Sequence, residues 1–228
     1  MPATVVRPTE LRYHHGMEIT WLGHCCFRLK AKEATVVTDP CDKTTGYSLG
    51  RPTADLVTVS IEDPAHNYVS GVAGDPRVIN GPGEFEIAGA SVVGVTTYRD
   101  KEKAAGAGRN IVYVIDLEEL RICHLGGIGH VPTSDQVEEI GAVDILLVPV
   151  GGGSSLDAPP AAEAVSMLEP RLVIPMHFQT DVERMKLDPV DRFLKEMGAK
   201  ATEKHAKIAV TRSSLPEAAQ VFILDYKH

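Results

Sequence analysis

The chain has 228 residues, of which 43% are hydrophobic and 24% are charged, and its formal net charge at pH 7 is −8. This composition is typical of a soluble globular protein whose core needs no disulfide or metal staples. The acidic balance disfavours nonspecific binding to nucleic acid or to an anionic membrane, and no apolar run approaches the roughly 18 to 20 residues of a membrane span. Neither partner is therefore expected.

The first 16 residues show no clear periodicity, and they lack the apolar core and small-residue cleavage site of a signal peptide. We expect a flexible N-terminal extension at 1–16 and a single domain at 17–228. No C-x-x-C pair occurs, which favours small buried thiols in a reduced, cytoplasmic compartment over a disulfide framework. The cysteines concerned are Cys25, Cys26, Cys41 and Cys123.

The first half of the domain is predicted to be almost entirely β-structure. Runs rich in β-branched residues, broken by glycine, proline or charged turns, predict strands. They lie at 17–23, 26–32, 34–40, 55–60 and 77–82, with strand pairs at 84–98 and 110–126. The polar, glycine-containing stretch at 99–109 is predicted to be a mobile surface loop.

The second half alternates helices and strands. Thr133 and Gln136 form a capping box that predicts a helix to residue 140, and Asp157 precedes a second helix with prolines in its first turn. A third helix is predicted from Asp188-Pro189 to Gly198. Strands are predicted at 144–151, 171–177, 205–212 and 220–226. Two sheets packed face to face with helices outside are the fold that this order suggests.

Polar side chains follow several of the predicted strands. Histidines at such positions are more often structural than functional, but five of them in one pattern predict that the strand ends converge on a cleft. This convergence is a hypothesis that the sequence alone does not prove. The residues concerned are His24, Asp39, Asp63, His66, Arg99, His124, His130 and His177.

A set of short motifs gives these residues a family context. WLGHCCF, TDP, the loop after DLVTVS, NGPGEFEIAG, HLGGIGH, LLVPVGG and VIPMHF occur in this order between residues 17 and 194. In this respect the chain resembles the metallo-β-lactamase superfamily, and in particular its branch of zinc-dependent hydrolases related to L-ascorbate-6-phosphate lactonase. The resemblance implies a four-layer αββα sandwich with an active cleft at one edge of the two sheets.

The resemblance also implies a dizinc centre built on an H-x-H-x-D-H loop, from which this sequence departs. Ile61, Asp63 and Ala65 stand at the first histidine, the second histidine and the aspartate of the loop. Arg99 and Gly127 stand where the branch has an intermediate histidine and the bridging aspartate. His66 and His177 are kept, and Asp63 is able to coordinate, so these three residues form the residual metal site that the resemblance implies.

Two interpretations of the remaining cleft are open. Arg99, which stays protonated and cannot ligate a metal, would either bind a small anion bidentately or form a salt bridge with Asp63 or Asp39 that fills the former metal cavity. The salt bridge is the favoured interpretation, and it predicts that Arg99→Ala lowers the melting temperature by several degrees. The candidate residues of the cleft are His24, Asp39, Arg99, His124 and His130.

Other chemistry has weaker support. The glycines at 151–153 either offer backbone N–H groups to an anion or form a turn, and the turn is favoured. A pair of Cys25 with His24 is not expected, because adjacent residues of a strand point to opposite faces.

The sequence therefore predicts a metallo-β-lactamase-fold protein without dizinc hydrolase activity, with a binding or assembly role or an unidentified reaction. The alternative is a hydrolase of a small anionic ester, lactone or phosphodiester that uses one residual divalent ion. No cofactor is expected under the first reading, and a single weakly bound zinc or manganese ion under the second. A small anionic ligand and homo-oligomerisation are the expected interactions.

Overall fold

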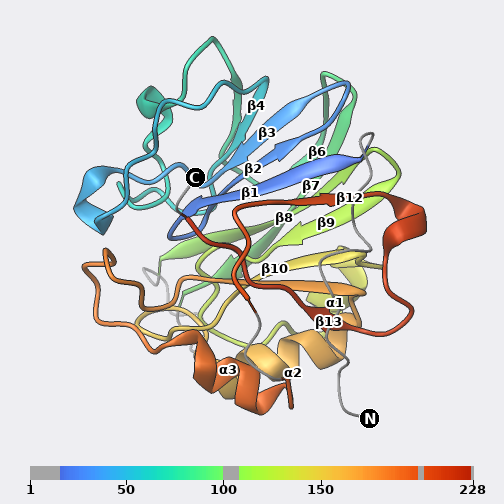
Figure 1. Ribbon diagram of the computed structural model, residues 1–228. Coiled ribbons are helices and arrows are strands. Elements are labelled where there is room, and N and C mark those ends of the chain that lie inside the picture. Colours follow the sequence, from blue (N-terminus) through green and yellow to red (C-terminus); the bar gives the residue numbers. More distant parts are fainter. Residues whose placement is uncertain (1–15, 100–107, 200–202, 227–228) are drawn as a thin grey trace.

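A computed structural model of the chain describes residues 16–99, 108–199 and 203–226 (Figure 1). The predictions for the N-terminal extension, and for most of the loop at 99–109, lie outside these residues. The protein consists of two β-sheets packed face to face with α-helices on one side, so the predicted α/β sandwich is confirmed.

The first sheet has six strands in the order β12-β1-β2-β3-β4-β5. β1, β2 and β3 form an antiparallel meander, and β3, β4 and β5 are parallel. The strands are β1 (Met17–Gly23), β2 (Cys26–Lys30), β3 (Thr35–Thr38), β4 (Leu56–Thr58), β5 (Arg77–Ile79) and β12 (Ile208–Val210).

The second sheet has seven strands in the order β13-β11-β10-β9-β8-β7-β6. β6 to β9 are antiparallel, whereas β9, β10, β11 and β13 are parallel to one another. The strands are β6 (Gly83–Ile87), β7 (Ala90–Tyr98), β8 (Arg109–Leu117), β9 (Leu120–His124), β10 (Ile145–Pro149), β11 (Leu172–Met176) and β13 (Gln220–Val221).

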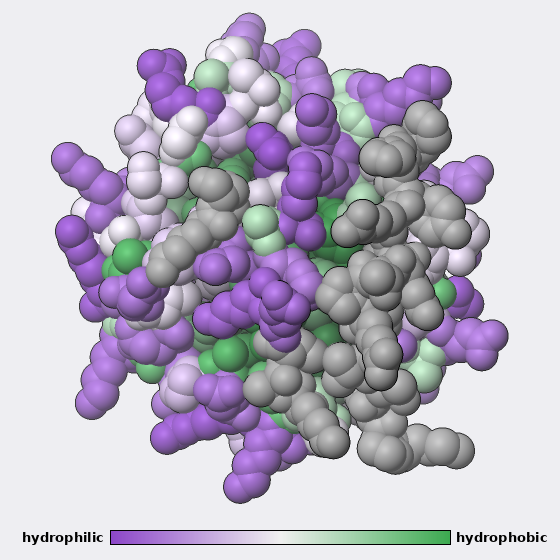
Figure 2. Space-filling view, viewed as in Figure 1, coloured by the Kyte–Doolittle hydropathy of each residue, from purple (hydrophilic) through white to green (hydrophobic). Residues whose placement is uncertain are grey.

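The helices lie on the seven-stranded sheet, below it in Figure 1. They are α1 (Ser134–Ile140), α2 (Ala158–Leu168) and α3 (Val190–Glu196), with 3-10 turns η2 (Lys43–Thr45), η3 (Val69–Gly71) and η4 (Arg212–Ser214). The capping box of Thr133 and Gln136 is present at the start of α1. None of the described helices has the length and apolar character needed to cross a membrane. Figure 2 shows many hydrophilic residues, with smaller hydrophobic spots between them, on the coloured part of one face.

Strands β1, β3 and β4 of the six-stranded sheet are buried on both faces, which explains their nearly continuous apolar runs. Val36 and Leu56 point into the main core between the two sheets. Their neighbours Val37 and Val57 point outward into a second, smaller core, since successive side chains of a strand alternate between faces. The second core is covered by chain from residues 41–72 with η2 and η3, so this outer layer of the sandwich contains no α-helix among the described residues.

Strands of the same direction bring their carboxyl ends to one edge of each sheet. In the first sheet these are β1, β3 and β4, and in the second β7, β9, β10 and β11. The carboxyl ends of strands are where α/β proteins place their ligands. The connections after these strands carry the polar residues that the sequence singles out.

Candidate functional site

Three polar residues directly after strands have a left-handed backbone. His24 follows β1 with φ 52°, Asp39 follows β3 with φ 40°, and His177 follows β11 with φ 52°. Such a conformation costs free energy for any residue with a side chain, and it concentrates at functional sites where the surrounding structure holds it in place. Three strand ends from two sheets thus turn sharply toward a common point.

The turn between β1 and β2 is fixed by its carbonyl groups. The carbonyl of His24 accepts hydrogen bonds from the indole Nε1 of Trp21 at 3.1 Å and from the backbone N–H of His177 at 3.1 Å. The carbonyl of Cys25 accepts one from Nε2 of His124 at 2.8 Å. Because His24 and Cys25 lie in a turn rather than a strand, both side chains reach the same site. The prediction that they point to opposite faces is therefore wrong.

His66 is oriented by a buried carboxylate. Its Nδ1 lies 2.7 Å from Oδ2 of Asp39. The same carboxylate accepts the backbone N–H of Ser60 at 2.7 Å and the Ser60 hydroxyl. A carboxylate only accepts hydrogen bonds, so Nδ1 of His66 donates to Asp39, and Nε2 is the ring nitrogen left for a ligand.

His24 is oriented in the same way by a residue that the sequence analysis did not identify. Its Nδ1 lies 3.0 Å from Oε2 of Glu183, whose other oxygen accepts the backbone N–H of Met185 at 3.0 Å. Glu183 is only 7% exposed and His24 1%. Nε2 of His24 is buried and has no hydrogen-bond partner among the described residues. Its lone pair is therefore available to a ligand.

Burial sets the protonation of the site. It lowers the pKa of His24 despite the hydrogen bond to Glu183, and it lowers the pKa of His177 well below the usual value, helped by repulsion from His24 and His66. Burial also raises the pKa of the Cys25 thiol well above its usual value. For Asp39, burial by itself raises the pKa, but interaction with His66 and the hydrogen bond from Ser60 outweigh it and keep the pKa low. His24 and His177 are thus uncharged at neutral pH.

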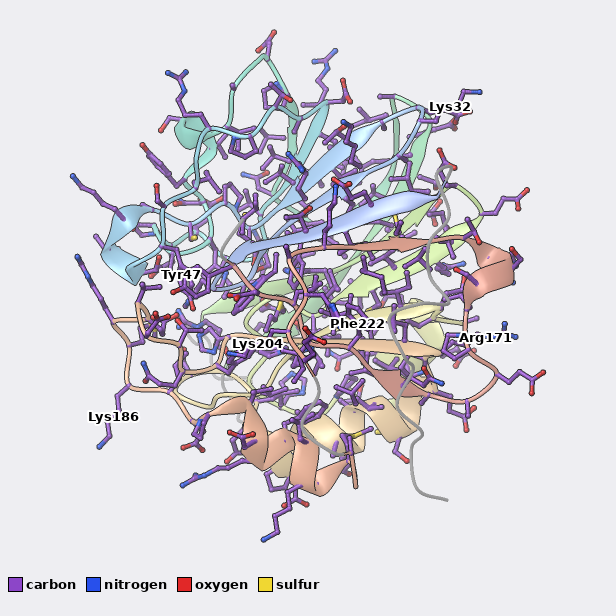
Figure 3. All side chains as sticks on the ribbon, viewed as in Figure 1. Lys32, Tyr47, Arg171, Lys186, Lys204 and Phe222 are labelled. Atoms are coloured by element: carbon purple, nitrogen blue, oxygen red, sulfur yellow. The ribbon has the colours of Figure 1, made fainter. Side chains whose placement is uncertain are left out.

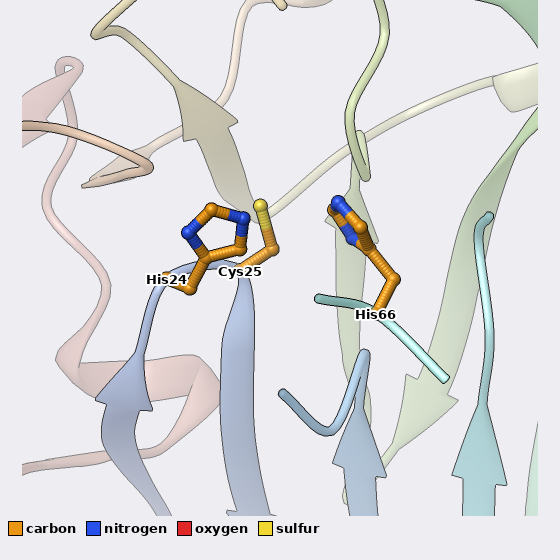
Figure 4. Close-up of side chains that lie close together, drawn as sticks. All are labelled: His24, Cys25 and His66. Carbon is orange, nitrogen blue, oxygen red and sulfur yellow. The ribbon is translucent and has the colours of Figure 1, made fainter. Parts of the chain in front are cut away.

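These side chains form a cluster of potential metal ligands. One nitrogen or sulfur atom from each of His24, Cys25 and His66 lies within 4.8 Å of the other two. Figure 4 shows the sulfur of Cys25 between the two imidazole rings, with a ring nitrogen of His24 facing it. The ring of His177 is adjacent, with its centroid 4.6 Å from that of His24.

A cavity of about 270 Å³ is lined by His24 and His66 of this cluster, whereas the Cys25 side chain is fully buried behind them. Of the residues predicted from the sequence, His24, Asp63, His66, Arg99 and His177 lie in its wall. Asp39, His124 and His130 do not. Asp39 and His124 lie behind the site and hold His66 and the Cys25 carbonyl, and His130 bonds through Nδ1 to the carbonyl of Val131 at 2.8 Å. The metal ligands predicted from the sequence were His66, His177 and Asp63. His66 belongs to the ligand cluster with His24 and Cys25, whereas Asp63 and His177 line the cavity without being part of that cluster.

Ile61 and Gly127, two of the positions at which the resemblance to the dizinc motif implies ligands, pack closely together. A Cβ atom built on Gly127 would lie only 2.6 Å from Cδ1 of Ile61. Ile61 is buried. The isoleucine therefore occupies the space into which a side chain at residue 127 would project, so the two substitutions are sterically coupled.

Arg99 does not form the predicted salt bridge. In the described part of the chain neither Asp39 nor Asp63 pairs with it, because Asp39 is bonded to His66 and Ser60, and Oδ1 of Asp63 accepts the backbone N–H of Ala65 at 3.0 Å. Instead, Nη2 of Arg99 donates to the hydroxyl of Ser154. The glycines before Ser154 form a turn, as predicted, since Gly152 and Gly153 have φ of 76° and 72°.

Comparison with known proteins places these features among related chains. A sequence profile described as a β-lactamase superfamily domain matches residues 18–177. A UPF0173 metal-dependent hydrolase of Thermoplasma volcanium is 29% identical over 202 residues, covering 76% of this chain and 88% of the relative. A UPF0173 protein of Pyrococcus furiosus is 27% identical, covering 79% and 90%.

Two solved structures have a similar fold. A Thermotoga maritima protein assigned to the Zn-dependent hydrolases of the metallo-β-lactamase superfamily is similar, with a TM-score of 0.76, 38% identity, and coverage of 91% of this chain and 98% of that one. An isothiocyanate hydrolase from gut bacteria of Delia radicum, with a TM-score of 0.66 and 12% identity, covers 86% and 99% and shares the fold alone.

The expectation that no cofactor binds is therefore corrected. Relatives that match most of the chain are named metal-dependent hydrolases, and the chain carries a His-Cys-His cluster suited to a metal. His24 was predicted as a residue of the cleft but not as a metal ligand, and Cys25 was not expected beside it. Both approach His66 through the sharp turn after β1.

Proposed function

Because the chain belongs to the β-lactamase superfamily, we propose that it is a hydrolase that works with one divalent metal ion, held by His24, Cys25 and His66. The observation that supports this most strongly is the pair of carboxylate-backed imidazoles. Asp39 behind His66 and Glu183 behind His24 are the arrangement by which metalloproteins fix the tautomer and direction of a ligating histidine.

The donor set favours zinc. Two imidazole nitrogens and a thiol are ligands that zinc accepts readily, whereas calcium and magnesium require oxygen ligands. The buried Nε2 of His24, which lacks a partner among the described residues, has its lone pair satisfied in such a site. The high pKa of the Cys25 thiol means that the thiol would lose its proton only on binding the ion, so metal binding would release a proton.

The chemistry that a zinc ion supplies when bound is acidification of a water molecule and polarisation of the bond to be cleaved. His177 would accept a proton from the attacking water, since it lines the cavity wall and lies beside His24. Esters, lactones and phosphodiesters are the substrates for which this chemistry is suited. The motifs shared with the branch related to L-ascorbate-6-phosphate lactonase make lactones the first class to test.

The test is zinc binding followed by turnover. Protein equilibrated with Zn²⁺ and freed of excess metal should contain one zinc ion per chain by mass spectrometry, and His24→Ala and His66→Ala should contain much less. His205→Gln is the matched control, because His205 stacks on Phe222 and takes no part in the cavity wall. Wild-type protein without zinc after this treatment would refute the proposed site.

Turnover is measured on a panel of activated esters, lactones and phosphodiesters with the zinc-loaded protein. Hydrolysis of one class that requires His66 and His177 supports the proposal. A protein that binds zinc but leaves the whole panel intact would refute the hydrolase function, and a binding or assembly role would then replace it.

A further inference from the structure

Among the described residues of the cavity wall, Arg99 is the cationic side chain that the proposed metal site leaves without a function. It follows β7 and is half-buried. The wall that it shares with His66 and His177 faces the position where a substrate of the proposed hydrolase would bind. An arginine keeps its positive charge in proteins, so this part of the wall carries a permanent cation.

The guanidinium group is held in place but not fully satisfied. Nη2 donates to the Ser154 hydroxyl, which fixes the orientation of the group. Nε is buried and has no hydrogen-bond partner among the described residues. A buried N–H without a partner is unfavourable in a folded protein, and such a group calls for a ligand that the protein itself does not supply.

Among the described residues, no carboxylate pairs with this guanidinium group. Asp63 is the acidic residue that the described part of the wall contains, and its Oδ1 accepts the backbone N–H of Ala65. The two buried carboxylates nearby are used by the histidines, Asp39 by His66 and Glu183 by His24. The hydroxyls of Thr44 and Thr45, also in the wall, donate to Asp42.

We propose that Arg99, positioned by Ser154, binds an anionic group of the substrate, a carboxylate or a phosphate, through Nε and the guanidinium edge. The proposal rests on the proposed function in that the anion would belong to the molecule hydrolysed at the adjacent cluster. The planar fork of arginine matches the geometry of both oxyanions. The substrate class is then an ester or lactone that carries a separate negative charge.

The test uses metal-free protein, so that it is independent of zinc binding and turnover. Inorganic phosphate and malonate are titrated separately into ¹⁵N-labelled protein, and the Arg99 Nε–Hε resonance is followed by NMR. We expect a saturable shift of this resonance with at least one of the two anions. The anion that produces the tighter effect identifies the class.

Variants give the second measurement. Arg99→Gln should weaken binding of the same anion about 10- to 100-fold, as expected for loss of a charge-assisted hydrogen bond, and Ser154→Ala should weaken it less. Arg171→Gln is the matched control, because Arg171 precedes β11 whereas the cavity lies after this strand. Figure 3 shows Arg171 on the opposite side of the molecule from Tyr47, which is two residues from Thr45 of the cavity wall. An Arg99 resonance that does not move with either anion, or equal affinity of folded Arg99→Gln, would overturn the proposal.

Discussion

Substitution of Glu183 by glutamine tests whether His24 is a metal ligand that a carboxylate orients. Glu183 uses both oxygens as acceptors, one for Nδ1 of His24 at 3.0 Å and one for the N–H of Met185 at 3.0 Å. Glutamine has one oxygen and one NH₂ group, so it cannot accept both hydrogens. If the NH₂ group faces His24, Nδ1 must become the acceptor, and the proton moves to Nε2, where the lone pair for the metal is needed.

If the glutamine turns the other way, its NH₂ group opposes the N–H of Met185, and a buried donor loses its partner. Loss of a carboxylate behind a ligating histidine typically costs 10- to 100-fold in metal affinity, which corresponds to about 1.4 to 2.7 kcal/mol. The unpaired donor is expected to lower the free energy of unfolding of the metal-free protein by about 1 to 3 kcal/mol.

Zinc affinity is measured by competition with a chromophoric chelator, and stability by urea unfolding of the metal-free protein. Glu163→Gln is the matched control, because Glu163 is exposed on α2 and should change neither quantity. If Glu183→Gln binds zinc as tightly as the wild-type protein, His24 is not held for a metal by this carboxylate, and the assignment of His24 as a ligand fails.

Three further predictions concern neighbouring features. Gly127→Ala places a Cβ atom 2.6 Å from Cδ1 of Ile61 and should cost about 1 to 3 kcal/mol of unfolding free energy in urea, whereas the double variant with Ile61→Ala should not show this clash. An additive effect of the two substitutions would contradict the coupling. Cys25→Ala should lower zinc affinity while Cys26→Ala, at a thiol outside the ligand cluster, leaves it unchanged, so equal zinc affinities would remove Cys25 from the site. In metal-free protein the lowered pKa of His177 means that the unfolded chain takes up its proton near pH 6.5 and the folded chain only at lower pH. Stability should therefore fall as the pH drops below about 6.5, by up to about 1.4 kcal/mol per pH unit for this group, and a His177→Gln variant should show a shallower decline in thermal unfolding.

The packing of Ile61 against Gly127 limits what residue 127 can be. An aspartate at this position would project its side chain into Ile61. The proposed ligand cluster lies elsewhere and uses a histidine and a thiol from the turn after β1 together with His66.

Much of the fold follows from local sequence. The apolar runs that became β1, β3, β10 and β11, and the capping box before α1, are signals that depend on neighbouring residues, and all were recognised. The meeting of His66 and His177 at one cleft was a hypothesis from the sequence, because they follow strands of different sheets, β4 and β11, and only the packing of the two sheets brings these strand ends together. Five of the predicted site residues line one cavity.

The hydrogen-bond partners of these residues did not follow from the sequence, because they lie far away along the chain and meet only in the folded protein. Glu183 meets His24 from 159 positions later in the chain, in a loop with no motif to mark it. Arg99 was expected to pair with a carboxylate. Asp39 instead forms a hydrogen bond with His66, and Arg99 donates a hydrogen bond to Ser154.

The sequence by itself determined the two-sheet sandwich and the order of its strands and helices, since each depends on the local pattern of side chains. Only the tertiary structure decided which donors meet. The left-handed φ of His24 turns Cys25 toward the same point, and two buried carboxylates then orient the imidazoles of His24 and His66. Those contacts depend on packing between segments far apart in the chain, and they bring His24, Cys25 and His66 into one cluster.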